Sequence, residues 1–138
     1  MLTKAKELHS EDYVNIWFHE DTNTLEMEWL DYVSSYRFKP TLEQALELAV
    51  QQNARYWLAN RVQMRELSDQ DRKWVTDTWL PKFLEHNFKK LAVVEPANAL
   101  HRVFEDQLLH NTNGTPVEIK CFQKRSEAMD WIVEDFEL

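Results

Sequence analysis

Short runs with the two-residue periodicity of β-strands alternate along this chain with segments that have the 3.6-residue periodicity of amphipathic helices. This alternation constrains the fold more than any other feature, because neighbouring parallel strands need a crossover between them, and that crossover is usually a helix. The order of elements is ββαβαβαβα. It predicts an α/β domain with a mostly parallel, mixed five-stranded sheet and flanking helices.

The first two strands are expected to form a hairpin. Residues 13–19 and 24–30 alternate between apolar and polar side chains, and the polar turn formers of residues 19–23 join them. The side chains predicted to face the core are Val14, Ile16, Phe18, Leu25, Met27 and Trp29. Asn15, Glu26 and Glu28 lie on the other face and are expected to meet solvent.

Three more strands follow, at about residues 55–59, 91–94 and 117–121. The middle one is continuously apolar, which predicts burial on both faces of the sheet. Cys121 falls on the inward side of the last strand and is interpreted as a small core residue.

Four helices are expected between and after these strands. The first spans about residues 42–52 and begins at a capping box formed by Thr41 and Gln44. The second begins at Ser68, with Asp71 three residues later, and runs towards residue 86 with a kink or break around Leu80 caused by Pro81. The third covers about residues 97–109, and the last is expected to be capped by Ser126.

Composition and charge limit the classes of partner. Lys and Arg total 16 against 24 Asp and Glu, so the net charge of −8 disfavours nucleic acid and anionic membrane surfaces. No apolar run is long enough for a membrane span. Residues 1–12 are interpreted as a solvated lead-in without an export signal, and residues 13–138 as one domain. With a single cysteine as well, the cytoplasm is the expected compartment.

The residues show no catalytic apparatus, so the sequence predicts a protein that is not an enzyme and holds no cofactor. The one glycine, Gly114, excludes a glycine-rich phosphate-binding loop or dinucleotide fingerprint. No serine has a flanking glycine, as a nucleophile elbow would require. The five histidines lack metal-ligand spacing, so no metal site is expected.

Binding residues are instead expected at the carboxyl ends of the parallel strands, where ligands collect in open α/β sheets. The candidates there are Asn60, Arg61, Gln63, Met64, Glu95, Asn98, Lys124 and Arg125. Arg61, Lys124 and Arg125 would place positive charge near the start of the helix that Ser68 caps. Trp17 and Trp74 fall on polar faces of their elements, which makes them candidate contact residues.

The assembled pattern resembles the STAS and SpoIIAA-like superfamily, and in particular its small stand-alone bacterial members of the Bacteroidetes type. The resemblance covers residues 13–136. The segments that carry it are Tyr36-Arg37-Phe38, Trp57-Leu58-Ala59-Asn60, Ser68-Asp69-Gln70-Asp71 leading into Trp74, Trp79-Leu80-Pro81 and Lys90-Leu91-Ala92-Val93-Val94.

This resemblance implies a non-enzymatic regulatory or protein-interaction module that binds a protein partner or a second copy of itself. In anti-sigma-factor antagonists of the superfamily, a serine in the loop after the third strand is phosphorylated. The matching residues 60–66 contain no Ser or Thr, and Ser68 is assigned as a helix cap. A weaker similarity to lipid-carrying CRAL-TRIO domains leaves an alternative, a carrier or sensor of a small apolar or lipid-like ligand. That alternative requires a cavity of at least ~300 Å³.

Overall fold

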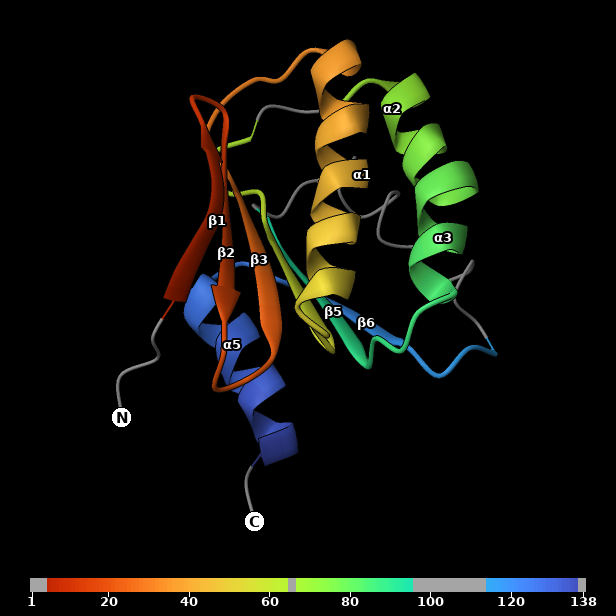
Figure 1. The fold of residues 1–138 in the computed structure, drawn as a ribbon. Helices are drawn as coiled ribbons and strands as arrows, with labels where there is room; N and C mark the ends of the chain where they lie inside the picture. The colour runs from red at the N-terminus through yellow and green to blue at the C-terminus, as the bar shows by residue number, and fades with distance from the viewer. Residues whose placement is uncertain (1–4, 65–66, 96–113, 137–138) are drawn as a thin grey trace.

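The computed structural model describes residues 5–64, 67–95 and 114–136, and these contain one mixed sheet (Figure 1). Its six strands lie side by side in chain order. They are β1 (Ala5–Glu11), β2 (Val14–His19), β3 (Thr24–Trp29), β4 (Tyr56–Asn60), β5 (Lys90–Val94) and β6 (Glu118–Phe122). β2 is antiparallel to both of its neighbours, β1 and β3, whereas β3 to β6 are parallel to one another. The predicted mixed α/β class is confirmed.

The predicted number of strands was wrong by one, because β1 lies within the segment expected to be a solvated lead-in. β1 pairs with β2 in antiparallel register, with an irregularity between Glu7 and His9. Most of its side chains are exposed, so it has no apolar face that a periodicity search would detect. The free hydrogen-bonding edge of β2 holds this strand, and its charged side chains suit an edge strand.

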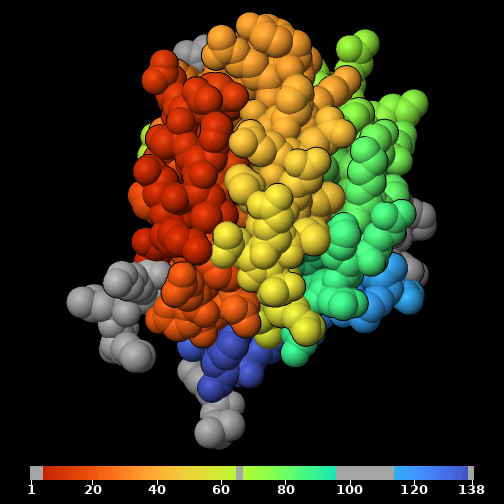
Figure 2. Space-filling view, in the orientation of Figure 1, coloured from red at the N-terminus to blue at the C-terminus, as the bar shows by residue number. Residues whose placement is uncertain are grey.

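Helices cover both faces of the sheet (Figure 1). On one face lie α1 (Ser35–Gln51), α2 (Asp69–Trp74), a π-helical segment (Val75–Trp79) and α3 (Leu80–Leu84). The opposite face carries α5 (Arg125–Val133), which continues into a 3₁₀ turn (Glu134–Phe136). Figure 2 shows α1 between the β1–β2 hairpin and α3 on the surface of the first face.

The central strands contribute side chains to two hydrophobic cores. Trp57 of β4 packs into the main core under α1 to α3, whereas its neighbour Leu58 packs into a smaller core under α5. Every residue of β5 is buried, which confirms the expected burial on both faces. The hairpin side chains predicted to point inward are all buried in the main core. Cys121 is partly buried against that core.

Helix α1 begins at Ser35, seven residues before the expected start at residue 42. Thr41 is therefore not a cap: it lies inside the helix, and its hydroxyl donates a hydrogen bond to the carbonyl of Arg37 at 2.6 Å. The helix also continues through Pro40, which lies ahead of the expected start. The extra turns bury Phe38, which is 2% exposed, and this burial offsets the hydrogen bond that proline cannot make.

The helical segment after β4 follows the predicted pattern. The backbone N–H of Asp71 donates to Oγ of Ser68 at 3.1 Å, as expected for a helix cap. The expected irregularity before Pro81 is the π-helical segment, in which the N–H of Leu80 bonds to the carbonyl of Val75, five residues back. A new helix, α3, then starts at Leu80.

The predicted cap of the last helix was wrong. Ser126 is not a cap, since α5 begins at Arg125 and its N-cap residue is Lys124. The inward face of α5 is buried as expected at Ala128, Trp131 and Ile132. The helix predicted for residues 97–109 lies outside the described residues.

A cluster of polar groups joins the C-terminal end of α5 to the sheet. The buried Lys90 of β5 donates to the carbonyl of Trp131 at 2.6 Å and pairs with Asp135 at 3.0 Å. The Tyr56 hydroxyl donates to the other carboxylate oxygen of Asp135 at 2.8 Å. Burial, followed by this carboxylate, raises the pKa of Tyr56 to about 12. The neutral phenol is thus part of what holds the end of α5.

This cluster predicts a loss of stability at high pH. The Tyr56 phenol ionises near pH 10 in the unfolded chain and near 12 in the folded one, so its contribution is complete below pH 10 and disappears between pH 10 and 12. We expect Tyr56→Phe to lower the free energy of unfolding by about 1 kcal/mol at pH 7. The difference between the variant and the natural protein should vanish by pH 12 in urea titrations. Tyr32→Phe, at an exposed tyrosine, should change neither quantity.

Candidate functional site

The carboxyl ends of the parallel strands meet at one edge of the sheet, together with the N-terminal ends of α1 and α2 (Figure 1). We call this edge, made of residues 30–36, 60–64 and 67–71, the carboxyl edge. In open α/β sheets, ligands bind in the crevice outside the carboxyl ends of the strands. The sequence placed its candidate binding loops at this edge.

A hollow of about 190 Å³ opens at the carboxyl edge, between the starts of α1 and α2. Its lining consists of Tyr32, Val33, Ser35, Met64, Leu67, Ser68 and Asp71. Only Met64 of these was among the predicted binding residues. Ser68 and Asp71 were assigned to helix capping, and residues 31–35 lie ahead of the expected start of the first helix, where no periodicity singles out a binding residue.

Asp71 is the most unusual residue of the hollow, since its carboxyl group is almost completely buried, with 4% of the residue exposed. Its Oδ2 accepts a hydrogen bond from Oγ of Ser35 at 2.8 Å, and its backbone N–H donates to Oγ of Ser68 at 3.1 Å. Its Oδ1 is also buried and has no hydrogen-bond partner among the described residues. The carboxyl group therefore ties the two helix starts together with half of its accepting capacity unused.

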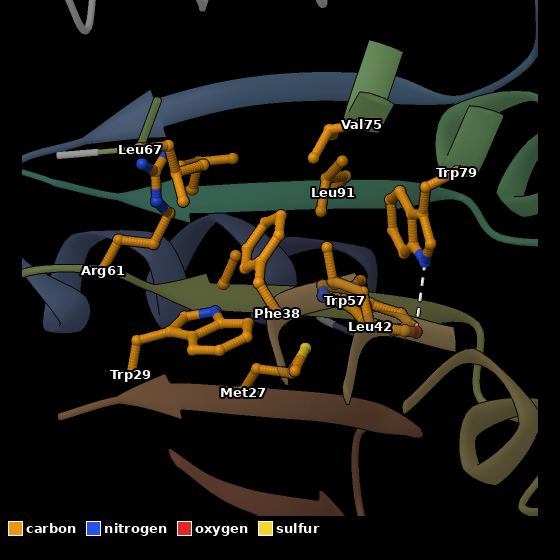
Figure 3. A pocket seen from close by; sticks show the side chains of 12 residues that line it. Met27, Trp29, Phe38, Leu42, Trp57, Arg61, Leu67, Val75, Trp79 and Leu91 are labelled. Atoms are coloured by element: carbon orange, nitrogen blue, oxygen red, sulfur yellow. Dashed lines mark hydrogen bonds between the residues drawn. The ribbon is translucent and has the colours of Figure 1, made fainter. Parts of the chain in front are cut away.

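A second cavity, of about 60 Å³, lies next to the hollow, between the sheet and the helices (Figure 3). Its wall is mainly apolar, with the rings of Trp29, Phe38, Trp57 and Trp79. Leu67 lines both this cavity and the hollow. The volume is far below the ~300 Å³ that a lipid-like ligand requires.

Arg61, expected as a charged loop residue, is instead buried where β4 ends (Figure 3). Its guanidinium NH1 pairs with Oε2 of the buried Glu95 at 3.0 Å. Burial lowers the pKa of Arg61, and the charge of Glu95 opposes this shift. Two of the predicted binding residues thus form a buried ion pair that joins the ends of β4 and β5.

Arg125 is likewise paired, on the other face of the sheet. Its Nε and NH2 donate to the two carboxylate oxygens of Glu26 at 2.7 and 2.6 Å. Glu26 was expected to face solvent but is 3% exposed, because Arg125 from α5 covers it and His19 bonds it at 2.8 Å. Burial alone would raise the pKa of Glu26, but the hydrogen bonds from Arg125 and His19 outweigh it and hold the pKa below its ordinary value.

The expected concentration of positive charge near Ser68 is therefore not formed. Arg61 and Arg125 each pair with a buried carboxylate, and Arg125 lies on the α5 face. Lys124 is exposed at the start of α5.

The two tryptophans selected as exposed contact residues are half-buried. Trp74 packs edge-to-face on Phe38 at 6.2 Å between ring centroids, and Nζ of Lys39 lies 5.9 Å from its ring. Both neighbours come from the turns of α1 that precede the start expected from the sequence. Trp17 lies in register between Glu7 of β1 and Glu26 of β3, so the extra strand shields it.

The remaining candidates have simple surroundings. Asn60 is half-buried, and its Oδ1 accepts a hydrogen bond from the N–H of Val62 at 3.3 Å. Gln63 is exposed. Asn98 lies outside the described residues.

Exposed apolar side chains gather at the carboxyl edge. Of the five large exposed hydrophobic residues in the described part of the chain, three lie there: Tyr32 (59% exposed), Tyr36 (73%) and Val62 (46%). Val50 and Phe136 are the other two and lie away from this edge. The residue types that mark this surface are tyrosines just before and within the first turn of α1, a position that the sequence periodicity could not reveal.

Within residues 5–64, 67–95 and 114–136, no group of three or more His, Cys, Asp or Glu side chains is arranged to hold a metal ion. None of the helices in these ranges has the length and apolar character needed to cross a membrane.

Fold and site together define a mixed α/β domain with a hollow at the carboxyl edge. No family model and no curated protein matches the chain. Among solved structures, the chain is similar to an uncharacterised protein of the DUF3478 family with a SpoIIAA-like fold from Shewanella loihica PV-4. The two share 19% sequence identity over 96% of each chain, with a TM-score of 0.49. No site or activity of this chain follows from this likeness.

The buried pair of Arg61 and Glu95 predicts an asymmetric response to mutation. Glu95→Leu leaves a buried guanidinium without its carboxylate, so we expect it to lower the free energy of unfolding by about 3 to 5 kcal/mol. Adding Arg61→Met should recover part of this loss in urea unfolding followed by tryptophan fluorescence. Glu43→Gln breaks an exposed pair with Lys82 and should cost less than about 1 kcal/mol. Additive losses in the double variant would contradict the assignment.

Proposed function

We propose that this protein is a non-enzymatic interaction module whose protein partner covers the carboxyl edge. The observation that carries the proposal is the exposure of Tyr32, Tyr36 and Val62 on segments of the carboxyl edge, where Tyr32 also lines the hollow. Exposed apolar side chains concentrated on one part of a small domain mark interaction surfaces, and tyrosine and methionine are enriched in them. The proposed surface therefore includes the start of α1, which the sequence did not indicate, and it no longer includes Trp74.

Part of this surface is held in place before any partner arrives. The guanidinium of Arg37 lies 5.7 Å from the ring centroids of both Tyr13 and Tyr36. A side chain that is already ordered loses less conformational entropy on binding. The contact therefore supports a role for Tyr36 as an anchor for the partner.

The serines at this edge support binding better than catalysis or a phosphoswitch. The Ser35 hydroxyl donates a hydrogen bond to the Asp71 carboxylate, and the Ser68 hydroxyl accepts a hydrogen bond from the backbone N–H of Asp71. A phosphate on either hydroxyl would lie against the Asp71 carboxylate and be repelled. The alternative function, a carrier of a lipid-like ligand, has less support because the apolar cavity measures only about 60 Å³. A larger hollow of about 570 Å³ between α1 and α3 is open to solvent, and most of its lining side chains are polar or charged, which does not suit a lipid.

Site-specific photocrosslinking tests the proposal. Benzoyl-phenylalanine replaces Tyr36 in one variant and Phe136 in a matched control, since both positions are exposed aromatics but only Tyr36 lies at the carboxyl edge. After irradiation in the protein's native cells, we expect a discrete crosslinked product from position 36 and none from position 136. Mass spectrometry of the product distinguishes a different protein from a second copy of this chain.

Two results would contradict the proposed surface. One is equal crosslinking from positions 36 and 136. The other is a product from position 136 alone, which would place the partner on the α5 side of the molecule.

A further inference from the structure

Asp71, at the floor of the hollow, has a buried carboxylate oxygen whose capacity to accept a hydrogen bond is unsatisfied. Its Oδ1 is buried and without a partner among the described residues, while Oδ2 accepts from Ser35 at 2.8 Å. The ion pairs found in the described part of the chain do not include Asp71. A buried acceptor that lacks a donor destabilises the fold, and a buried carboxylate without a cation does so more strongly.

We propose that this hollow binds the ammonium group of a lysine side chain presented by the partner. The inference rests on the proposed interaction function and names the chemistry that the partner brings. An ammonium group has three N–H donors. The hollow offers three oxygens that can accept them, namely Oδ1 of Asp71 and the hydroxyl oxygens of Ser35 and Ser68.

The single free carboxylate oxygen distinguishes ammonium from guanidinium. Arginine binds carboxylates best through two parallel hydrogen bonds, which need both oxygens. Here Ser35 already occupies Oδ2, so only Oδ1 is left. A compact point charge with freely rotating donors fits this arrangement better than a planar fork.

The walls of the hollow suit the methylene stem of lysine. Val33, Met64 and Leu67 are apolar, and the ring of Tyr32 stands at the rim with 59% of the residue exposed. Long charged side chains lay their stems along such surfaces. Oδ1 is shielded from water in this structure, so entry of the ammonium group requires a wall to shift. Met64 is half-buried, and its unbranched thioether side chain has several rotamers for this movement.

Binding of a minimal probe to the full-length protein tests the inference by NMR. The probe is Nα-acetyl-lysine methylamide, and its neutral counterpart carries an acetyl group on Nζ. We expect saturable shifts of the Ser35 and Asp71 amide signals with the lysine probe. The acetylated probe and Nα-acetyl-arginine methylamide should each bind at least about tenfold more weakly, since they lose a charge-assisted hydrogen bond or do not fit the site.

Two pairs of variants separate recognition from folding. Asp71→Asn keeps the shape and an acceptor for Ser35 but removes the charge, and it should weaken the lysine probe at least about tenfold. Asp69→Asn is the matched control: it removes one negative charge from an exposed side chain two residues before Asp71, and it should leave binding unchanged. Met64→Trp fills the hollow without altering Asp71 and should abolish binding; Gln63→Trp, at the exposed neighbour, should not.

The results separate this inference from the function on which it rests. Equal affinity for the acetylated probe, unchanged binding to Asp71→Asn, or no binding of the lysine probe would overturn the lysine site. A partner crosslinked at position 36 would still stand in each case. Conversely, charge-dependent binding of the probe without any crosslink at position 36 would uphold an ammonium site and overturn the protein-interaction function.

Discussion

The burial of β4 and β5 on both faces is the constraint on which the rest of this structure depends. Successive side chains such as Trp57 and Leu58 enter different cores, so each face of the sheet must be covered by helices. Parallel pairing forces every connection to cross from one end of the sheet to the other. The ends of β3 to β6 and the starts of α1 and α2 are thereby collected at one edge, and the hollow lies where two of these connections meet.

The same two-sided burial explains the treatment of charged groups inside the molecule. Glu26 and Lys90 lie on the α5 face of the sheet, where α5 supplies Arg125 for the first and the Trp131 carbonyl for the second. Arg61 is balanced by Glu95 in a comparable way. Asp71 differs from all of these, because its described contacts are neutral donors. This contrast is the reason for proposing that the Asp71 carboxylate binds a cation from a partner, whereas the other buried charges bind groups of this chain.

Much of the fold was predictable because local periodicity and capping depend on neighbouring residues. The β2–β3 hairpin, the doubly buried β5, the Ser68 cap and the helix irregularity before Pro81 all carried such signals. The two main errors have a common cause. β1 has no apolar face, and α1 passes through Pro40, so in both cases a tertiary contact overrides the local pattern. The longer α1 then covers Trp74, which changes the position of the exposed surface.

The sequence by itself determined the α/β class and the position of residues 60–64, Met64 included, at the carboxyl end of a parallel strand. Only the tertiary structure decided which side chains are buried in pairs and which remain exposed. Arg125 meets Glu26 across 99 positions in the chain, and Ser35 meets Asp71 across 36. Periodicity describes the direction of a side chain relative to its own element. It contains no information on what another element brings against it, and that contact decides whether a charge is neutralised, shielded or left to bind a partner.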